Sequence, residues 1–128
     1  MIPRTLFDEE HEIFRDAARK FFETEAAPYH EQWEEDGQVD RALWNKAGEL
    51  GMLCPTVPEA LGGVGGDFRY NAIIAEEAMR FGLSGLGFGL HSDITVPYIV
   101  NHGSTAQQEK YLEKCISGEI VTAIAMTE

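Results

Sequence analysis

Apolar residues recur at helical spacing in the first part of the chain. Between Asp8 and Glu25 they fall at positions 13, 14, 17, 18, 21 and 22. Steps of three and one place these positions on a single face of an α-helix. Asp8 is a suitable N-terminal cap, and the glutamates after it favour the positive end of the helix dipole. The pattern therefore predicts a first helix over residues 8–25 that buries this apolar face and ends before Pro28.

The helical spacing continues in five further segments. Asp40 and Asp67 stand where N-caps are expected, and Ser104 with Gln107 three residues later is a capping-box motif. Pro97 lies inside one segment and predicts a kink or a first helical turn there. The predicted helices cover residues 29–36, 41–50, 68–81, 91–101 and 105–117.

These segments predict an all-α fold, an up-and-down or orthogonal bundle of about six helices. The segment 91–101 is apolar around much of its circumference, so we expect it to be central and buried.

The last residues break the helical pattern. Residues 120–126 are β-branched and apolar, which predicts a strand, and a lone strand is not a stable element. We therefore expect residues 1–119 to form a helical domain. Residues 120–128 are expected to be a short orphan C-terminal strand that opens a missing β-domain. The alternative is a terminal segment that packs on the bundle or frays.

Charge limits the classes of partner. Lys and Arg number 10 against 22 Asp and Glu, which gives a formal net charge of −12. Nucleic acid and anionic membrane surfaces both require a basic face, so neither is expected as a partner. No stretch approaches the roughly 18 to 20 apolar residues of a membrane span, and from the first residues we expect no secretory signal. Cys54 and Cys115 are expected to be reduced thiols, which predicts a cytoplasmic protein, or one of the mitochondrial matrix if it is eukaryotic.

Residue types alone indicate no catalytic and no metal site. The histidines lack the spacing of helical metal ligands, and no Glu-x-x-His motif is present. Glu76 and Glu77 are interpreted as solvated acidic residues. His91, Ser92 and Asp93 are adjacent on a predicted helix, so their side chains diverge and do not form a triad.

Two glycine-rich stretches interrupt the helices. Residues 62–66 follow no strand and lack the Lys-Ser/Thr of a phosphate-binding loop, so a tight turn is the simpler interpretation. Gly85, Gly87 and Gly89 precede an apolar helix. The missing side-chain volume indicates either a pocket for an apolar ligand or close helix packing, and spacing alone does not separate the two.

Several short motifs follow one another in a fixed order along nearly the whole chain. They are PEALGGVGGD at 58–67, EE at 76–77, NHGS at 101–104, QQEKYL at 107–112, a glycine at 118 and AIAMTE at 123–128. Each is weak alone, but the ordered set resembles the N-terminal domain of acyl-CoA dehydrogenases. The stretch GFGLHS at 87–92 is most similar to long-chain members.

The resemblance implies an architecture and a reaction. Family members have an N-terminal helical domain, a middle β-domain and a C-terminal four-helix domain, bind FAD between domains and usually form tetramers. Their reaction is α,β-dehydrogenation of a fatty acyl-CoA thioester, with electron-transfer flavoprotein as the expected acceptor. The glutamate base of the family lies in the later helical domain, so the resemblance implies no catalytic residue here and a chain that is inactive alone.

Site residues also follow from the resemblance. It implies that Ile124, the backbone of Met126 and the hydroxyl of Thr127 face the flavin ring. The residues matched to the far end of the acyl pocket are Gly85, Gly87, Phe88, Leu90 and His91.

Two other functions compete with this hypothesis. A free-standing helical module could bind an acyl chain or a protein partner without catalysis, and an acyl-CoA oxidase would keep the fold but change the chemistry. If domains are missing, the surface that holds Ile124, Met126 and residues 85–91 should be apolar and uncovered.

Overall fold

The computed structural model describes residues 2–127 and contains, within that range, six α-helices and no strand. Two π-helical segments, η1 (Phe22–Ala26) and η3 (Leu90–Thr95), and a 3-10 turn, η2 (Glu59–Leu61), complete the regular elements. The prediction of an all-α bundle of about six helices is confirmed. The helices are α1 (Glu9–Phe21), α2 (His30–Asp36), α3 (Arg41–Glu49), α4 (Phe68–Arg80), α5 (Val96–His102) and α6 (Thr105–Ser117).

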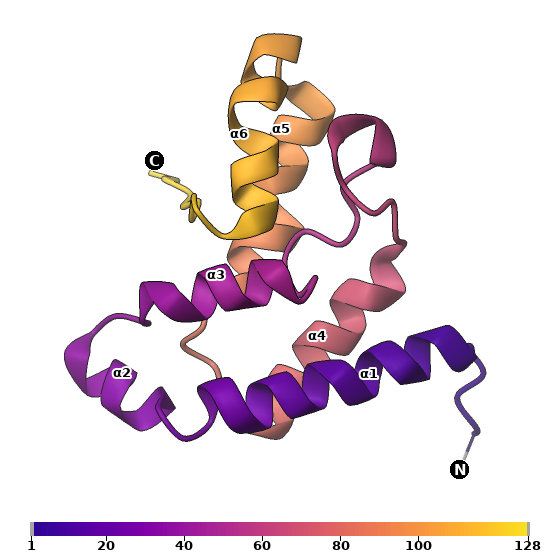
Figure 1. Ribbon diagram of the computed structural model, residues 1–128, viewed down its shortest axis with the longest axis vertical. Coiled ribbons are helices and arrows are strands. Elements are labelled where there is room, and N and C mark those ends of the chain that lie inside the picture. The colour runs from indigo at the N-terminus through magenta and orange to yellow at the C-terminus, as the bar shows by residue number, and fades with distance from the viewer. Residues whose placement is uncertain (1, 128) are drawn as a thin grey trace.

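The helices pack as two pairs with α3 crossing between them (Figure 1). α1 packs along α4, α5 packs beside α6, and α3 contacts α6. The last residues leave the end of α6 and run away from the helices, so the two described ends of the chain lie on different sides of the molecule (Figure 1).

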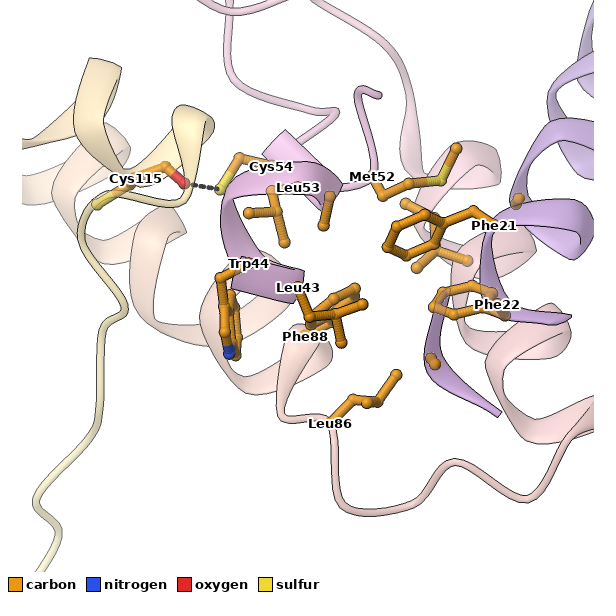
Figure 2. Close-up of a cluster of buried hydrophobic side chains, with 14 of the residues drawn as sticks. Phe21, Phe22, Leu43, Trp44, Met52, Leu53, Cys54, Leu86, Phe88 and Cys115 are labelled. Carbon is orange, nitrogen blue, oxygen red and sulfur yellow. Dashed lines mark hydrogen bonds between the residues drawn. The ribbon is translucent and has the colours of Figure 1, made fainter. Parts of the chain in front are cut away.

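The core lies where α1, α3 and the second glycine-rich stretch meet (Figure 2). The rings of Phe21, Phe22, Trp44 and Phe88 are each at most 5% exposed. Trp44 and Phe88 have ring centroids 4.7 Å apart, a distance typical of favourable aromatic pairs. Phe88 therefore fixes the stretch around residues 85–89 to the helices.

Side-chain caps begin several helices as predicted. Ser104 Oγ accepts the Gln107 N–H at 3.3 Å, and Gln107 Oε1 accepts the Ser104 N–H at 2.8 Å, so the capping box is confirmed. Asp40 and Asp67 accept the backbone N–H two residues later, at 3.0 and 2.9 Å. These bonds satisfy N–H groups that the helix itself leaves unpaired.

The inward face of α1 differs from the prediction. Ile13 is 66% exposed and Ala17 is also exposed, whereas His11 and Arg15 are buried beside Ala18. The polar pair lies inward because α4 supplies an aromatic ring next to His11 and carboxylates next to Arg15. Apolar spacing located this helix, but the buried face also depends on the partners that the facing helix provides.

The segment 91–101 is helical, but its predicted burial is wrong. Ile94 and Tyr98 are 46% and 58% exposed, and Val96 alone among its apolar residues is fully buried. The segment divides into η3 and α5, and Pro97 lies in the first turn of α5, one of the two predicted outcomes. Because it packs mainly against α6, the segment lies at the surface of the bundle.

The C-terminal segment is extended but does not form the predicted strand. Residues 121–127 have no regular secondary structure, because a strand requires a hydrogen-bonded partner and residues 2–127 contain none. Side-chain burial nevertheless alternates: Ile120, Thr122 and Ile124 are half-buried and the residues between them are exposed. This period of two is that of an extended chain. Glu128 lies outside the described residues, and the boundary between 119 and 120 stays a prediction.

Candidate functional site

A largely apolar hollow lies between α4 and the glycine-rich stretch that leads into η3. Its volume is about 360 Å³, within the range of roughly 300–1,000 Å³ typical of small-molecule sites. Ile74, Ala78 and Met79 line it from α4, and residues 83–90 other than Gly85 line it from the facing side. The sequence left a pocket and close helix packing open for this stretch, and the structure has a hollow there.

Three of the five residues predicted for the acyl pocket, Gly87, Phe88 and Leu90, line this hollow. Gly85 does not, because it lies against α2, where its N–H donates to His30 Nε2 at 3.2 Å. The structure thus brings the central part of the predicted set together on one wall and places its first member elsewhere.

His91 also lies outside the lining of the hollow. Its side chain is 0% exposed, and both ring nitrogens are occupied within the chain. Nε2 lies 2.9 Å from the Cys115 carbonyl oxygen, and Nδ1 accepts the Thr122 N–H at 3.1 Å. Burial lowers the pKa of His91, which favours the neutral ring that these partners require.

Two glycines shape the hollow for different reasons. Gly87 has a φ of +78°, a conformation that other residues adopt only with strain. Gly89 has helical backbone angles, and a Cβ there would meet only Asp93 Oδ2, at 3.6 Å, which is an ordinary contact. A larger side chain at position 89 would therefore take up space beside the hollow without straining the backbone.

One edge of the hollow is polar. Asn71 Nδ2, on α4, donates a hydrogen bond to Asp93 Oδ1, on η3. Burial raises the pKa of Asp93, although the Asn71 hydrogen bond opposes this shift. The pair connects α4 to η3 at the edge of a largely apolar lining.

The residues predicted to contact a cofactor lie on the extended C-terminal segment. Ile124 is half-buried, Met126 is 81% exposed and Thr127 is exposed. From residue 123 to 127 no backbone group pairs with another described residue. Free N–H and C=O groups and a threonine hydroxyl are the chemistry that binds the polar edge of a flavin ring, so these residues fit FAD.

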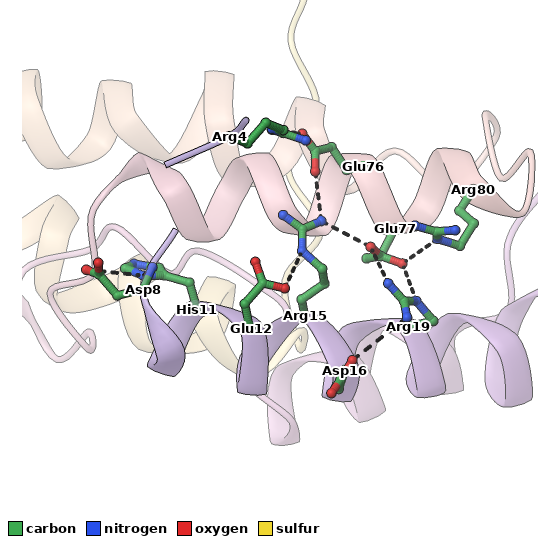
Figure 3. Close-up of polar contacts among 10 residues, drawn as sticks. All are labelled: Arg4, Asp8, His11, Glu12, Arg15, Asp16, Arg19, Glu76, Glu77 and Arg80. Atoms are coloured by element: carbon green, nitrogen blue, oxygen red, sulfur yellow. Dashed lines mark hydrogen bonds and ion pairs between the residues drawn. The ribbon is translucent and has the colours of Figure 1, made fainter. Parts of the chain in front are cut away.

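A cluster of ion pairs between α1 and α4 was missed by sequence reasoning (Figure 3). The Glu77 carboxylate is buried and accepts hydrogen bonds from Arg15 at 3.1 Å, Arg19 at 2.9 Å and Arg80 at 2.9 Å. Burial alone would raise the pKa of Glu77, but the three guanidinium groups outweigh it and lower this pKa to about 2. The prediction that Glu77 is a solvated residue is therefore wrong. A carboxylate with such a low pKa is also a poor proton acceptor, so Glu77 does not suit the role of a general base.

Asp8, Glu10 and His11 bring three potential metal-ligand atoms within 4.8 Å of one another. The Nδ1 lone pair of His11 is already used, because it accepts the Asp8 N–H at 3.1 Å. The buried ring packs on Tyr70, with ring centroids 4.8 Å apart. This arrangement is the N-terminal capping box of α1, and we assign no ligand set to it.

The two thiols are buried and show no sign of activation. The Cys54 N–H donates to Ser92 Oγ at 3.0 Å, which connects the loop after α3 to η3. Burial raises the pKa of Cys54 to about 12 and also raises the pKa of Cys115. A nucleophilic thiol needs a lowered pKa, so neither side chain suits covalent catalysis.

Comparison with known proteins places this arrangement in a family. Residues 8–119 match the family described as acyl-CoA dehydrogenase, N-terminal domain. The chain belongs to this family. It is 47% identical over 125 residues to the protein named long-chain specific acyl-CoA dehydrogenase, mitochondrial, of Rattus norvegicus. The matched residues make up 98% of this chain and 29% of the rat protein.

Two solved structures extend the comparison. An acyl-CoA dehydrogenase from Geobacillus kaustophilus superimposes with a TM-score of 0.92 at 48% identity, over 98% of this chain and 33% of that one. An acyl-CoA dehydrogenase from Bacillus anthracis complexed with FAD gives a TM-score of 0.83 at 34% identity, over 94% of this chain and 21% of that one. The chain thus spans a third or less of the length of these acyl-CoA dehydrogenases.

In this acyl-CoA dehydrogenase N-terminal domain, the hollow and the extended segment are the two parts that offer chemistry to a ligand. The hollow presents mostly apolar side chains, and the segment presents backbone groups from 123 to 127 that pair with no other described residue. Within residues 2–127, none of the helices has both the length and the apolar character that a membrane span requires.

Proposed function

We propose that the chain is the N-terminal part of an FAD-dependent acyl-CoA dehydrogenase that acts on fatty acyl-CoA thioesters, with long acyl chains preferred. The observation that carries this proposal is the largely apolar hollow between α4 and residues 83–90. A fatty acyl chain is apolar along its length, so it matches that lining. Glycine at positions 87 and 89 leaves the hollow open, which supports a long chain as the substrate.

The residues of this chain bind and orient rather than transfer protons. Gly87, Phe88 and Leu90 would hold the acyl chain and exclude water, while Met126 and Thr127 would contact the cofactor with backbone and hydroxyl groups. Bound FAD supplies the acceptor for the hydride that leaves the substrate. The low pKa of Glu77 argues against it as the base, so we propose that a glutamate of a later domain removes the α-proton and that this chain alone is inactive.

The remaining parts of the proposal follow from the family. Residues 1–119 are the helical domain, and residues 120–128 open a middle β-domain. The complete protein is a homo-oligomer that passes electrons to electron-transfer flavoprotein. We place it in a reducing compartment, the cytoplasm or the mitochondrial matrix, because its buried cysteines are free thiols.

The experiment alters position 89 in the protein that carries this chain together with its later domains. Gly89→Leu adds a side chain that displaces roughly three methylenes of a long acyl chain, at about 0.8 kcal/mol each. We expect kcat/KM for palmitoyl-CoA to fall by about 30- to 100-fold while the value for butyryl-CoA changes little. Ala17→Leu, at an exposed helical position on α1 outside the lining, is the control. Equal loss for both substrates would contradict the assignment of the hollow.

One observation favours the alternative of a free-standing module that binds an acyl chain: the hollow lies wholly within the described residues. Gel filtration of the 128-residue chain after mixing with FAD separates the two hypotheses. We expect negligible flavin to remain bound, because the flavin contacts proposed for this chain all come from one short segment and are too few to hold the cofactor. Tight, stoichiometric retention would contradict the proposal. Oxygen consumption by the complete protein would distinguish an acyl-CoA oxidase from a dehydrogenase.

A further inference from the structure

Residues 118–122 are held by side chains from two elements, α3 and η3, at the point where the chain leaves α6. Arg41, on α3, donates from Nη2 to the carbonyl oxygens of Gly118 at 3.2 Å and Glu119 at 2.6 Å. His91, on η3, accepts the Thr122 N–H at 3.1 Å. We refer to Arg41 and His91 together as the exit clamp.

The hydrogen bonds of His91 define a single tautomer. The carbonyl of Cys115 can only accept, so Nε2 must carry the proton. The amide of Thr122 can only donate, so Nδ1 must present its lone pair, and the Thr122 hydroxyl lies 2.9 Å from the same atom. A protonated ring would set an N–H against the Thr122 N–H. The contact with the C-terminal segment therefore requires neutral His91.

The surroundings of His91 favour this neutral form. Arg41 places a positive charge nearby from α3, and the Trp44 ring packs edge-on with centroids 5.4 Å apart. From α6, Cys115 faces the ring with its carbonyl oxygen, and its thiol is buried. Burial lowers the pKa of His91, which agrees with the tautomer that its partners require.

The clamp lies directly before the residues that the proposed function assigns to the cofactor. An extended chain advances about 3.3 Å per residue, so Ile124 and Thr127 lie roughly 7 and 17 Å beyond Thr122. A change of direction at Thr122 would displace them by several ångströms. Gly118 restricts the path further, because it has a φ of +80° and a Cβ there would fall 2.2 Å from the Trp44 carbonyl oxygen.

We propose that His91 is a positioning residue that, through Thr122, sets the direction of the segment carrying Ile124, Met126 and Thr127 and so places it against the flavin. This inference rests on the proposed function for its link to the flavin. It gives His91 a different role from the contact with the acyl chain that the resemblance implied.

The first test is made on the 128-residue chain. His91→Phe keeps a flat ring but removes both hydrogen bonds, and we expect amide hydrogen exchange at Thr122 to accelerate about tenfold. His91→Gln retains one donor and one acceptor and should restore part of the protection. His102→Phe, at the exposed end of α5, is the matched control. Unchanged exchange at Thr122 in His91→Phe would overturn the proposal.

A measurement on the unmodified chain guards against a variant that fails to fold. Nitrogen-15 NMR of the His91 ring should show protonation at Nε2 and a bare Nδ1 at neutral pH. A ring protonated at Nδ1, or one that changes tautomer freely, would overturn the proposal without any substitution.

The second test uses the flavin-loaded protein that carries this chain with its later domains. We expect His91→Phe to shift the flavin absorbance spectrum and weaken flavin retention, with partial rescue by His91→Gln and no effect of His102→Phe. Faster exchange at Thr122 with an unchanged flavin spectrum and retention would overturn the positioning role. An unmodified protein that binds no flavin would contradict the proposed function instead, while exchange at Thr122 would still decide whether the clamp exists.

Discussion

Glu77 provides the sharpest prediction about what holds α1 against α4. Its carboxylate is buried among Arg15, Arg19 and Arg80, and its pKa falls from the ordinary value of 4.5 to about 2. That difference corresponds to about 3 kcal/mol of stability. Removing one partner of a buried ion pair costs a similar amount, about 3–5 kcal/mol. We therefore expect Glu77→Gln to lower the free energy of unfolding at neutral pH by about 3 kcal/mol.

The pH dependence tests the cause of this loss. Because the folded-state pKa of Glu77 lies below its unfolded value, its ionisation stabilises the fold above pH 4.5, and this contribution is lost as the pH falls towards about 2. Protonated Glu77 resembles glutamine, so the difference between the original protein and Glu77→Gln should fall to less than half by about pH 3.

Urea unfolding followed by circular dichroism from neutral pH to about pH 3 measures this difference. Glu113→Gln, at an exposed position on α6, is the matched control and should change stability by less than about 0.5 kcal/mol. A loss below about 1 kcal/mol in Glu77→Gln, or a loss that stays constant with pH, would refute the reasoning.

Two further predictions concern packing and thiol reactivity. Gly118→Ala forces a Cβ to within 2.2 Å of the Trp44 carbonyl oxygen, whereas Gly37→Ala, also at positive φ, meets no neighbouring atom. Measured by thermal unfolding, the free energy of unfolding should fall by about 1 kcal/mol in Gly37→Ala, from backbone strain alone, and by at least about 2–3 kcal/mol in Gly118→Ala. Equal losses of stability in the two variants would contradict the close contact. Burial raises the pKa of Cys54 to about 12 and also raises the pKa of Cys115. Iodoacetamide at about pH 8 should therefore label neither thiol until urea unfolds the chain. Fast labelling of the folded protein would contradict this prediction.

The helices could be predicted because their signals are local. Ser104 and Gln107 form the predicted capping box, and Asp40 and Asp67 cap the helices that follow them. Pro97 marks a first turn as expected. Each of these signals depends on neighbours within a few residues, so one sequence is enough to identify it.

The buried polar contacts could not be predicted, because their partners are distant in the sequence. Glu77 meets Arg15 and Arg19 across 62 and 58 positions, and nothing near Glu77 indicates that contact. His91 meets Thr122 across 31 positions. The spacing of Arg15 and Arg19, four residues apart on one helical face, was the available signal, but it does not identify the carboxylate between them.

The candidate site was predicted in part for the same reason. Missing side-chain volume at Gly87 and Gly89 is visible in the sequence, and both residues line the hollow. The hydrogen bond that holds Gly85 against His30 depends on the path of α2, which spacing does not determine. The C-terminal segment is extended, as the predicted strand requires, but a strand also needs a hydrogen-bonded partner, and residues 2–127 supply none.

The central claim is that this helical domain forms one wall of a site where a flavin oxidises a fatty acyl-CoA. The most direct measurement is anaerobic addition of palmitoyl-CoA to the flavin-loaded protein that carries this chain with its later domains. We expect the visible absorbance of the flavin to bleach as the enoyl-CoA product forms, with Gly89→Leu bleaching far more slowly. A fully loaded flavin that no acyl-CoA, long or short, can bleach would contradict the account.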